Sequence, residues 1–237
     1  RNDLARGPKP EVIPANERRR APLPVRLAVE TSWQSTCQAG LDPANLASVF
    51  VSGIGDTQLT DYMCRTVTGD NTALSPTKFH NSVHNAAAGY WTISTGCMQA
   101  ANSVAGFQES VSLTLMEGLV ECQIEQRPIL LTFYDAPSSK VLQELLRNEY
   151  PFSASIIIAP AGTAPSQPRF VAEIDNQGCE PPDFSGSELL EHCYEVNPAA
   201  KILPLLKILA TQPMDFQQSL SMPLSLGSRL TIKAIAS

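Results

Sequence analysis

The chain has 237 residues, enough to bury one substantial hydrophobic core. Hydrophobic residues make up 43% of it and charged residues 17%, which excludes a disordered chain, and no apolar run reaches the roughly 18–20 residues of a membrane span. The net charge of −6 is uneven: residues 1–26 hold seven basic and three acidic side chains, and the remainder holds ten basic and twenty acidic ones. A body this acidic is poorly suited to binding nucleic acid.

The first 26 residues differ in composition from the rest. They contain five prolines and few apolar side chains, which predicts an extended basic arm over 1–26, followed by a single domain over 27–237. The six cysteines lie far apart, without the spacing of a zinc site, and the chain opens without a signal-peptide pattern. We therefore expect free thiols in a reducing compartment, and with them a cytoplasmic location.

Hydrophobic periodicity and capping residues predict the elements of the domain. Gly40 marks the end of the first helix, Asp56 caps the second, and Ser75 or Thr77 caps the third. Helices are predicted at residues 25–40, 56–68, 75–93, 104–122, 139–148, 186–194 and 198–210. Strands are predicted at residues 46–51, 127–137, 152–159, 169–174 and 229–236. Strands and helices alternate and then strands cluster, which predicts a layered α/β fold with a mixed sheet between helices.

Two stretches are candidates for ligand binding. The turn SGIGD, residues 52–56, follows a strand but lacks the third glycine of GxGxxG and the GK[ST] of a P-loop, so a structural turn is favoured. His80 and His84 share a face of the predicted helix, but HNSVH lacks the glutamate of HExxH and no third ligand lies nearby. Helix packing or an interface is therefore favoured over a metal site.

A third candidate is the small-residue stretch ANSVAGF, residues 101–107, which is predicted to be a turn that leads into the buried helix. A nucleophile at such a turn gains from the helix N-terminus, because its partial positive charge stabilises an anion. The stretch offers Ser103, and Cys97 precedes it. A serine needs a base, since its hydroxyl is un-ionised at neutral pH, and His80 or His84 would have to fold close to supply one.

Four stretches together resemble the N-terminal half of the β-ketoacyl synthases, the thiolase-like condensing enzymes: LASVFVSGIGD, SPTKFHNSVHNAAAGYWTIST, the turn 101–107 with its helix, and PILLTFYDA. The resemblance implies a thiolase-like layered fold, truncated relative to full condensing enzymes. In that family the catalytic cysteine sits in the small-residue turn that begins the central buried helix. Alignment of Gly106 with the family's glycine places Ser103 at the nucleophile position, and a slip of two residues places Ala101 or Ala105 there.

The resemblance is to a relative without catalytic residues. The family's two catalytic histidines lie in HGTxT-like and GHxxGxxG-like motifs, and His192, in LLEHCYE, matches neither. The chain therefore resembles a chain length factor, the non-catalytic subunit of a heterodimeric ketosynthase in type II polyketide pathways. Its length is similar to that of the short form paired with the ketosynthase of bacterial aryl polyene biosynthesis. The resemblance implies no cofactor.

An active ketosynthase is the partner that the resemblance implies. The helix that matches SPTKFHNSVHNAAAG lies near the dimer interface in that family, which implies a contact or cavity lining made by His80, Asn81, His84 and Asn85. The shared acyl tunnel would limit the length of a polyene or polyketide chain. The candidates for its gate are Phe107, Val111, Leu113 and Met116.

An acyl carrier protein is the second implied partner. Carrier proteins are acidic and so is this body, so the carrier is expected to dock mainly on the ketosynthase. Arg18, Arg19 and Arg20 offer a minor contact.

Two alternative functions stay open at this point. One is an active acyltransferase or hydrolase that uses Ser103 or Cys97. The other is a structural or binding module without any role in a tunnel.

Overall fold

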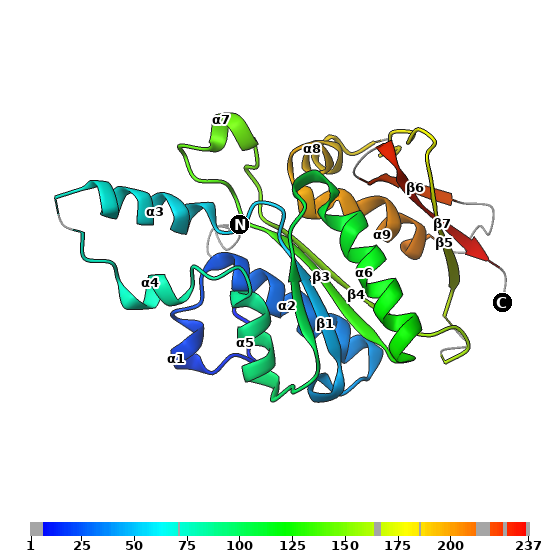
Figure 1. Cartoon of the computed structure of the whole chain (residues 1–237), viewed down its shortest axis with the longest axis horizontal. Coiled ribbons are helices and arrows are strands. Elements are labelled where there is room, and N and C mark those ends of the chain that lie inside the picture. Colours follow the sequence, from blue (N-terminus) through cyan, green and yellow to red (C-terminus); the bar gives the residue numbers. More distant parts are fainter. Residues whose placement is uncertain are drawn as a thin grey trace.

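The computed structural model describes residues 7–70, 72–163, 167–184, 186–211, 219–224 and 227–235 (Figure 1). The α-helices are α1 (Ala15–Arg18), α2 (Leu23–Ala39), α3 (Thr57–Thr68), α4 (Pro76–His80), α5 (Ala86–Thr95), α6 (Ser110–Glu125), α7 (Gln143–Leu146), α8 (Glu188–Val196) and α9 (Leu203–Ala210). The 3-10 helices are η1 (Pro43–Asn45), η2 (Phe107–Glu109) and η3 (Pro198–Ile202). The strands are β1 (Ala47–Val51), β2 (Ala101–Val104), β3 (Ile129–Asp135), β4 (Phe152–Ile158), β5 (Arg169–Asp175), β6 (Ser219–Pro223) and β7 (Arg229–Ile235).

A four-stranded sheet in the order β2-β1-β3-β4 forms the centre of the molecule (Figure 1). β1 pairs in parallel with both β2 and β3, and β3 pairs antiparallel with β4. Every residue of β1 and β3 is buried, as expected of strands that are covered on both faces. The prediction of a layered α/β fold with a mixed sheet is confirmed.

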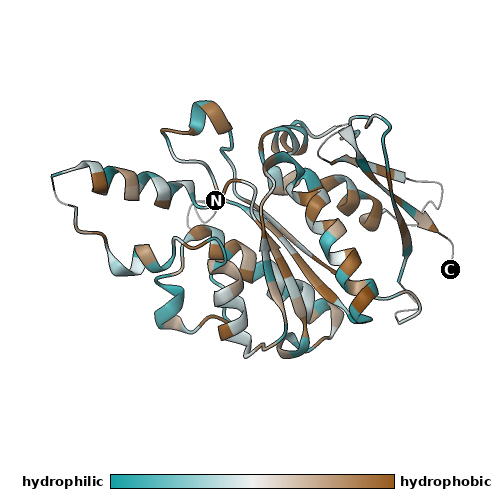
Figure 2. Ribbon diagram, in the orientation of Figure 1, coloured by the Kyte–Doolittle hydropathy of each residue, from teal (hydrophilic) through white to brown (hydrophobic). Residues whose placement is uncertain are grey.

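The central strands supply two separate cores, because successive side chains of a strand point to opposite faces. On one face, Phe50 and Leu130 pack with α2 and α5, including the fully buried Trp91. On the other face, Val49 and Leu131 pack with α6, η3 and α9. Figure 2 shows hydrophobic residues along these strands, with helices on both sides of them.

A second sheet, in the order β5-β7-β6, packs on the side of α6 and α9. Leu230 and Ile232 of β7 point into the shared core. The other face of this sheet is polar: Arg229 pairs with Asp175 at 2.7 Å, and Lys233 pairs with Glu173 at 2.6 Å. Such a face is suited to water, so no further layer is needed to cover it.

The prediction of an extended arm over 1–26 is wrong for much of the described range 7–26. Residues 15–18 form α1, and α2 already begins at Leu23. Ile13 is fully buried in the core between α2 and α5. Together with the buried Ala21, this apolar side chain anchors a segment whose average composition is polar. Residues 1–6 lie outside the described part of the chain.

The helix predicted over 75–93 divides into α4 and α5. Ser75 caps α4 as predicted, but the turn 81–85 separates the two helices. Asn81 is buried there, and its Nδ2 donates to the backbone oxygen of Arg20 at 3.1 Å. Ser82 donates its hydroxyl to Phe79 O at 2.7 Å. Side-chain bonds of this kind compete with the helical pattern and end the helix.

The helix predicted over 139–148 is likewise reduced, to α7. Ser138 and Asn148 lie near the two ends of the loop that carries α7. The Ser138 hydroxyl and the Ser138 backbone nitrogen both donate to Asn148 O at 2.9 Å. These contacts close a loop around the short helix. Strand β6 was not predicted from the sequence.

The packing of α6 on β3 depends on Gly118. An added Cβ there would lie 2.5 Å from Leu131 Cδ2, whereas Gly89 in α5 has nothing within 4 Å of its Cβ position. We predict that Gly118→Ala lowers the free energy of unfolding by about 1–3 kcal/mol through overpacking. The control Gly89→Ala should raise it by about 0.5–1 kcal/mol, because alanine favours the helix. Urea unfolding measures both, and equal effects would contradict the account.

Candidate functional site

Asp135 joins two loops at the carboxyl end of the central sheet. It is the last residue of β3, it is fully buried, and its carboxylate accepts four hydrogen bonds. The Ser52 hydroxyl and Ile54 N donate to Oδ1 at 2.6 Å and 3.2 Å. Gly53 N and Ala199 N donate to Oδ2 at 3.2 Å and 3.1 Å. One side chain therefore holds both the turn after β1 and the start of η3.

The ionisation of Asp135 is shifted by this environment. Burial raises its pKa from 3.8 to about 6, and the hydrogen bonds from Ser52, Ile54, Gly53 and Ala199 oppose the rise without cancelling it. The charge is tolerated in the interior because four hydrogen-bond donors point at it.

Two buried asparagines extend this network. Asn197 Oδ1 accepts from Ala199 N and Ala200 N at 3.0 Å and 3.3 Å, and its Nδ2 donates to Asn148 Oδ1 at 3.1 Å. Asn148 Nδ2 donates to Ala136 O at 2.9 Å. The loop that carries α7 is thereby fastened to both β3 and η3.

A third loop, Ala105–Phe107, meets the other two at Gly53. A Cβ on Gly53 would collide with Pro198 and would lie 2.9 Å from Phe107 O, so only glycine fits at this point. Phe107 has a left-handed φ of 49° at the start of η2, which leads into α6, and 47% of it is exposed. A strained residue at a strand-to-helix turn is how some enzymes present a nucleophile, and here the residue is phenylalanine.

The prediction that residues 101–107 form one turn is wrong for its first four residues. Residues 101–104 are β2 and pair in parallel with β1, with Ser103 opposite Phe50. Ser103 Oγ is buried and has no hydrogen-bond partner in the described structure. Cys97 is buried and donates to Leu46 O at 3.4 Å. The turn that starts the central helix therefore contains neither Ser103 nor Cys97.

The three histidines of the chain lie on other elements than Ser103 and Cys97. His80 ends α4 and His84 lies in the turn that follows, both exposed, so the prediction that they share one helical face is wrong. His192 on α8 packs with its ring centre 6.1 Å from that of Tyr150. Within the described ranges, no hydrogen bond joins a histidine to Ser103 or Cys97, and no cluster of three His, Cys, Asp or Glu side chains could hold a metal ion.

The four gate candidates do not share one surface. Phe107 is half-exposed in the turn, and Met116 is partly buried. Leu113 packs against the turn, because a Cβ on Gly106 would lie 2.5 Å from its Cδ1. Val111 is only 1% exposed and belongs to the core between the two sheets.

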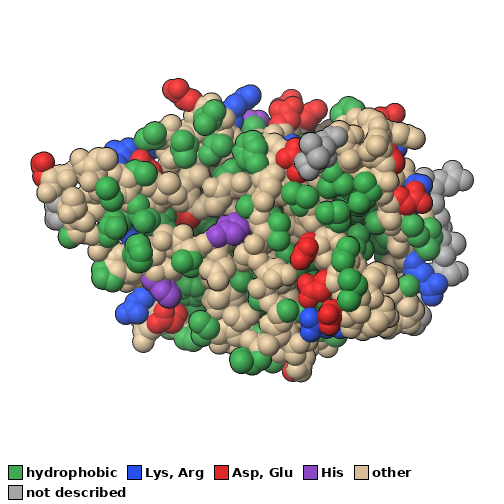
Figure 3. Space-filling view, viewed as in Figure 1, with side chains coloured by type: hydrophobic (Ala, Val, Ile, Leu, Met, Phe, Trp, Pro, Cys, Tyr) green, Lys and Arg blue, Asp and Glu red, His purple; other side chains and the backbone are tan. Residues whose placement is uncertain are grey.

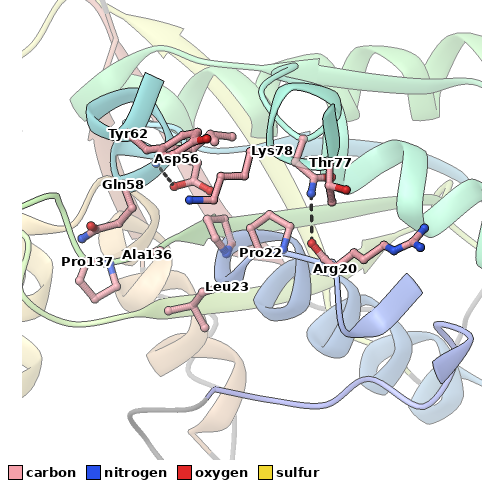
Figure 4. Close-up of a pocket in the computed structure, with 13 residues that line it drawn as sticks. Arg20, Pro22, Leu23, Asp56, Gln58, Tyr62, Thr77, Lys78, Ala136 and Pro137 are labelled. Carbon is pink, nitrogen blue, oxygen red and sulfur yellow. Dashed lines mark hydrogen bonds between the residues drawn. The ribbon is translucent and has the colours of Figure 1, made fainter. Parts of the chain in front are cut away.

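A groove of about 500 Å³ separates α3 and α4 from the start of α2 and the end of β3 (Figure 4). Its walls are mostly apolar and include Leu23, Leu59 and Pro137. Lys78 points into it, with Nζ 3.5 Å from the centre of the Tyr62 ring. Such a groove offers contact to apolar groups, and its lining also holds the charged residues Arg20, Lys78 and Asp56.

The free thiols expected from the sequence are confirmed, because all six cysteines are unpaired. Among the described helices, none is long and apolar enough to cross a membrane. The central role of Asp135 was not predicted. Its sequence signal is an acid at the end of a continuous apolar strand, in FYDA.

Comparison with protein families identifies the fold. The model of the beta-ketoacyl synthase N-terminal domain matches residues 2–195, so the chain belongs to this family. The match starts well before residue 27, in agreement with a folded N-terminal segment. The comparison with curated proteins gives no match.

Solved structures agree at low sequence identity. A chain in the complex of the ketosynthase ApeO with its chain length factor ApeC, from Xenorhabdus doucetiae, has a TM-score of 0.67 at 15% identity, over 93% of this chain and 81% of that one. A β-ketoacyl synthase from Burkholderia phymatum has a TM-score of 0.53 at 12% identity, over 81% of this chain and 57% of that one. The tetronic acid condensing enzyme AbyA1 has a TM-score of 0.51 at 10% identity, over 88% and 85%. The layered fold of the condensing enzymes is shown by these likenesses.

Replacement of the Asp135 carboxylate should destabilise the loops at the carboxyl end of the central sheet. We predict that Asp135→Asn lowers the free energy of unfolding at pH 7 by about 1–3 kcal/mol, because the amide nitrogen would face two N–H or O–H donors. The control is Asp70→Asn at an exposed position, which should change the free energy of unfolding by less than about 0.5 kcal/mol. Denaturant unfolding of both variants checks this, and equal stabilities would contradict it.

The raised pKa of Asp135 also predicts a pH dependence. Between about pH 4 and pH 6 the folded chain binds the proton more tightly than the unfolded chain, so the contribution of Asp135 to stability falls as pH rises through this window and is constant above it. The difference in unfolding free energy between wild type and Asp135→Asn should therefore be larger at pH 4.5 than at pH 7.5. Parallel stability curves for the two proteins would contradict the assignment.

Proposed function

We propose that the chain is the non-catalytic subunit, or chain length factor, of a heterodimeric ketosynthase. The observation that supports this proposal is the turn Ala105–Phe107, because it leads from β2 into the central helix, where the resemblance implies the family's nucleophile. Its methyl, hydrogen and phenyl side chains have no lone pair to attack an acyl thioester. The catalytic centre would then belong to the partner, and the fold of this subunit would serve assembly and tunnel shape.

A ketosynthase partner is supported by family membership and by the resemblance to a ketosynthase–chain length factor complex. We propose β2 as the contact. It lies at the edge of the sheet, between α5 and α6 (Figure 1), and no strand in the described part of the chain pairs with its outer side. An open strand edge is a template for pairing with another chain.

Exposed apolar side chains lie on the elements next to β2, which are α5, the loop before β2, η2 and α6. Between 47% and 93% of each is exposed, and we call the set the edge surface: Ile93, Met98, Phe107, Val120 and Ile124. Hydrophobic side chains gather over α6 on the face shown in Figure 3. An apolar surface next to an open strand favours a protein partner over water.

Residues 80–85, from the end of α4 to the start of α5, are proposed to extend this contact toward the partner. His80, His84 and Asn85 are exposed in this stretch. Asn81 would act only indirectly, because it is buried and holds the loop to Arg20 O.

An acyl carrier protein is proposed to dock mainly on the ketosynthase, because two acidic surfaces repel one another. The arginines of the N-terminal segment have contacts within the chain: Arg18 donates to Pro10 O at 3.1 Å, and Arg20 lies 3.5 Å from Glu17. They are solvent-screened, so their attraction for a carrier would be weak.

The edge surface should decide assembly. We predict that Ile93→Glu with Met98→Glu weakens binding to the ketosynthase at least tenfold, because two carboxylates would be desolvated at the interface. The control is Val67→Glu on α3, which is 60% exposed and lies outside the edge surface. Titration of the purified partner measures the three affinities. Equal binding by all three would refute this placement of the interface.

Three gate candidates should set product length. Each buried methylene of a growing chain gains about 0.8 kcal/mol, whereas a clash with a bulky side chain costs about 1–3 kcal/mol. Phe107→Ala, Leu113→Ala and Met116→Ala are therefore expected to lengthen the product of the reconstituted complex, as mass spectrometry would show. Val111 belongs to the core, so Val111→Ala should instead lower the free energy of unfolding.

The matched control for product length is Val141→Ala, because Val141 is 62% exposed in the loop before α7. It should leave product length unchanged. If all three gate variants also gave the wild-type product, the tunnel role of this helix would be wrong.

A further inference from the structure

A small cavity of about 120 Å³ lies beside the start of α6. Its lining includes Gln108 of η2, Val111 of α6, Tyr194 of α8, Lys201 of η3 and Met222 of β6. The cavity therefore lies where the helical layer meets the second sheet. Its Gln108 directly follows Phe107, the last residue of the turn.

Lys201 brings a positive charge to this cavity, and the Glu195 carboxylate attracts it without forming an ion pair. Within the described residues, its ammonium forms no ion pair: it donates to Glu195 O at 3.5 Å and lies 4.2 Å from the centre of the Tyr194 ring. The first contact is at the limit of hydrogen bonding, and the second is modest. Burial lowers the pKa of Lys201, which Glu195 partly opposes. The cation is thus partly desolvated without full compensation.

Two neutral polar groups accompany the lysine. Gln108 and Tyr194 line the cavity, and within the described part of the protein neither the Gln108 amide nor the Tyr194 hydroxyl has a hydrogen-bond partner. The nearby Ser112 hydroxyl is already used, because it donates to Pro223 O at 2.6 Å. The remaining walls, from Val111 and Met222, are apolar.

We propose that this cavity is a binding site for a small carboxylate, of the size of acetate to malonate. The Lys201 ammonium pairs with the anion, and the amide and hydroxyl groups donate to its oxygens. The volume corresponds to about four water molecules at ~30 Å³ each, which is too little for an acyl chain. A carboxylate bound here bridges η2, α8 and η3 behind the turn. The site belongs to this chain alone and does not depend on a partner.

Saturation-transfer NMR on the full chain tests the site, with sodium acetate as the probe and ionic strength held constant with chloride. The expected result is a saturable acetate signal that malonate displaces. Lys201→Met should reduce the signal at least fivefold. Lys207→Met is the matched control, because this lysine on α9 is 55% exposed and contacts Asp183. It should leave the signal unchanged.

A second variant guards against a folding defect. Gln108→Leu keeps the cation, removes one donor, and should weaken acetate binding at least twofold with the melting temperature preserved. The proposal is overturned if wild type shows no saturable acetate signal, or if sodium chloride displaces acetate as well as malonate does at equal ionic strength. It is also overturned if Lys201→Met and Gln108→Leu both fold and both bind acetate as wild type does.

Discussion

Asp135 places a negative charge inside the molecule at the end of β3, and the charge persists there because four donors from two loops surround it. This one constraint fixes the turn after β1 and the start of η3. Through the close approach at Gly53, it also fixes the backbone of Phe107. The strand-to-helix turn Ala105–Phe107 therefore keeps a defined shape, although its own side chains are only a methyl group, a hydrogen and a phenyl ring. In physical terms, the scaffold of the site stabilises the fold whether or not chemistry takes place there.

Local signals in the sequence were sufficient for much of the fold. The apolar strand β3, the caps of α3 and α4 at Asp56 and Ser75, and the left-handed Gly40 after α2 all depend on nearest neighbours. Contacts between distant segments account for the misses. The polar stretch 101–104 becomes a strand only because it pairs with β1. The predicted helix over 75–93 breaks because Asn81 binds a carbonyl sixty-one residues earlier.

The candidate site was predictable in outline and not in detail. The resemblance pointed to the turn before the central helix. In the structure Ser103 belongs to β2, and the turn is formed by Ala105–Phe107 instead. The partners of Asp135 lie 64 to 83 residues away from it in sequence, so no motif reveals them. The cavity at Lys201 is likewise assembled from elements of both halves of the chain.

The two sheets end in different ways, and the difference bears on assembly. The outer face of the second sheet carries ion pairs and suits water, whereas the β2 edge of the first sheet is open and has apolar side chains around it. A partner that covers the β2 edge would complete the buried sheet, and a further layer on the second sheet would bury charges at a cost. The edge surface is for this reason the central element of the proposed heterodimer.

Light-scattering chromatography of this chain, alone and co-expressed with the ketosynthase of its own gene neighbourhood, tests that claim most directly. The account predicts a single species that contains one copy of each chain. Two separate peaks, with this chain stable by itself and indifferent to the ketosynthase, would contradict it.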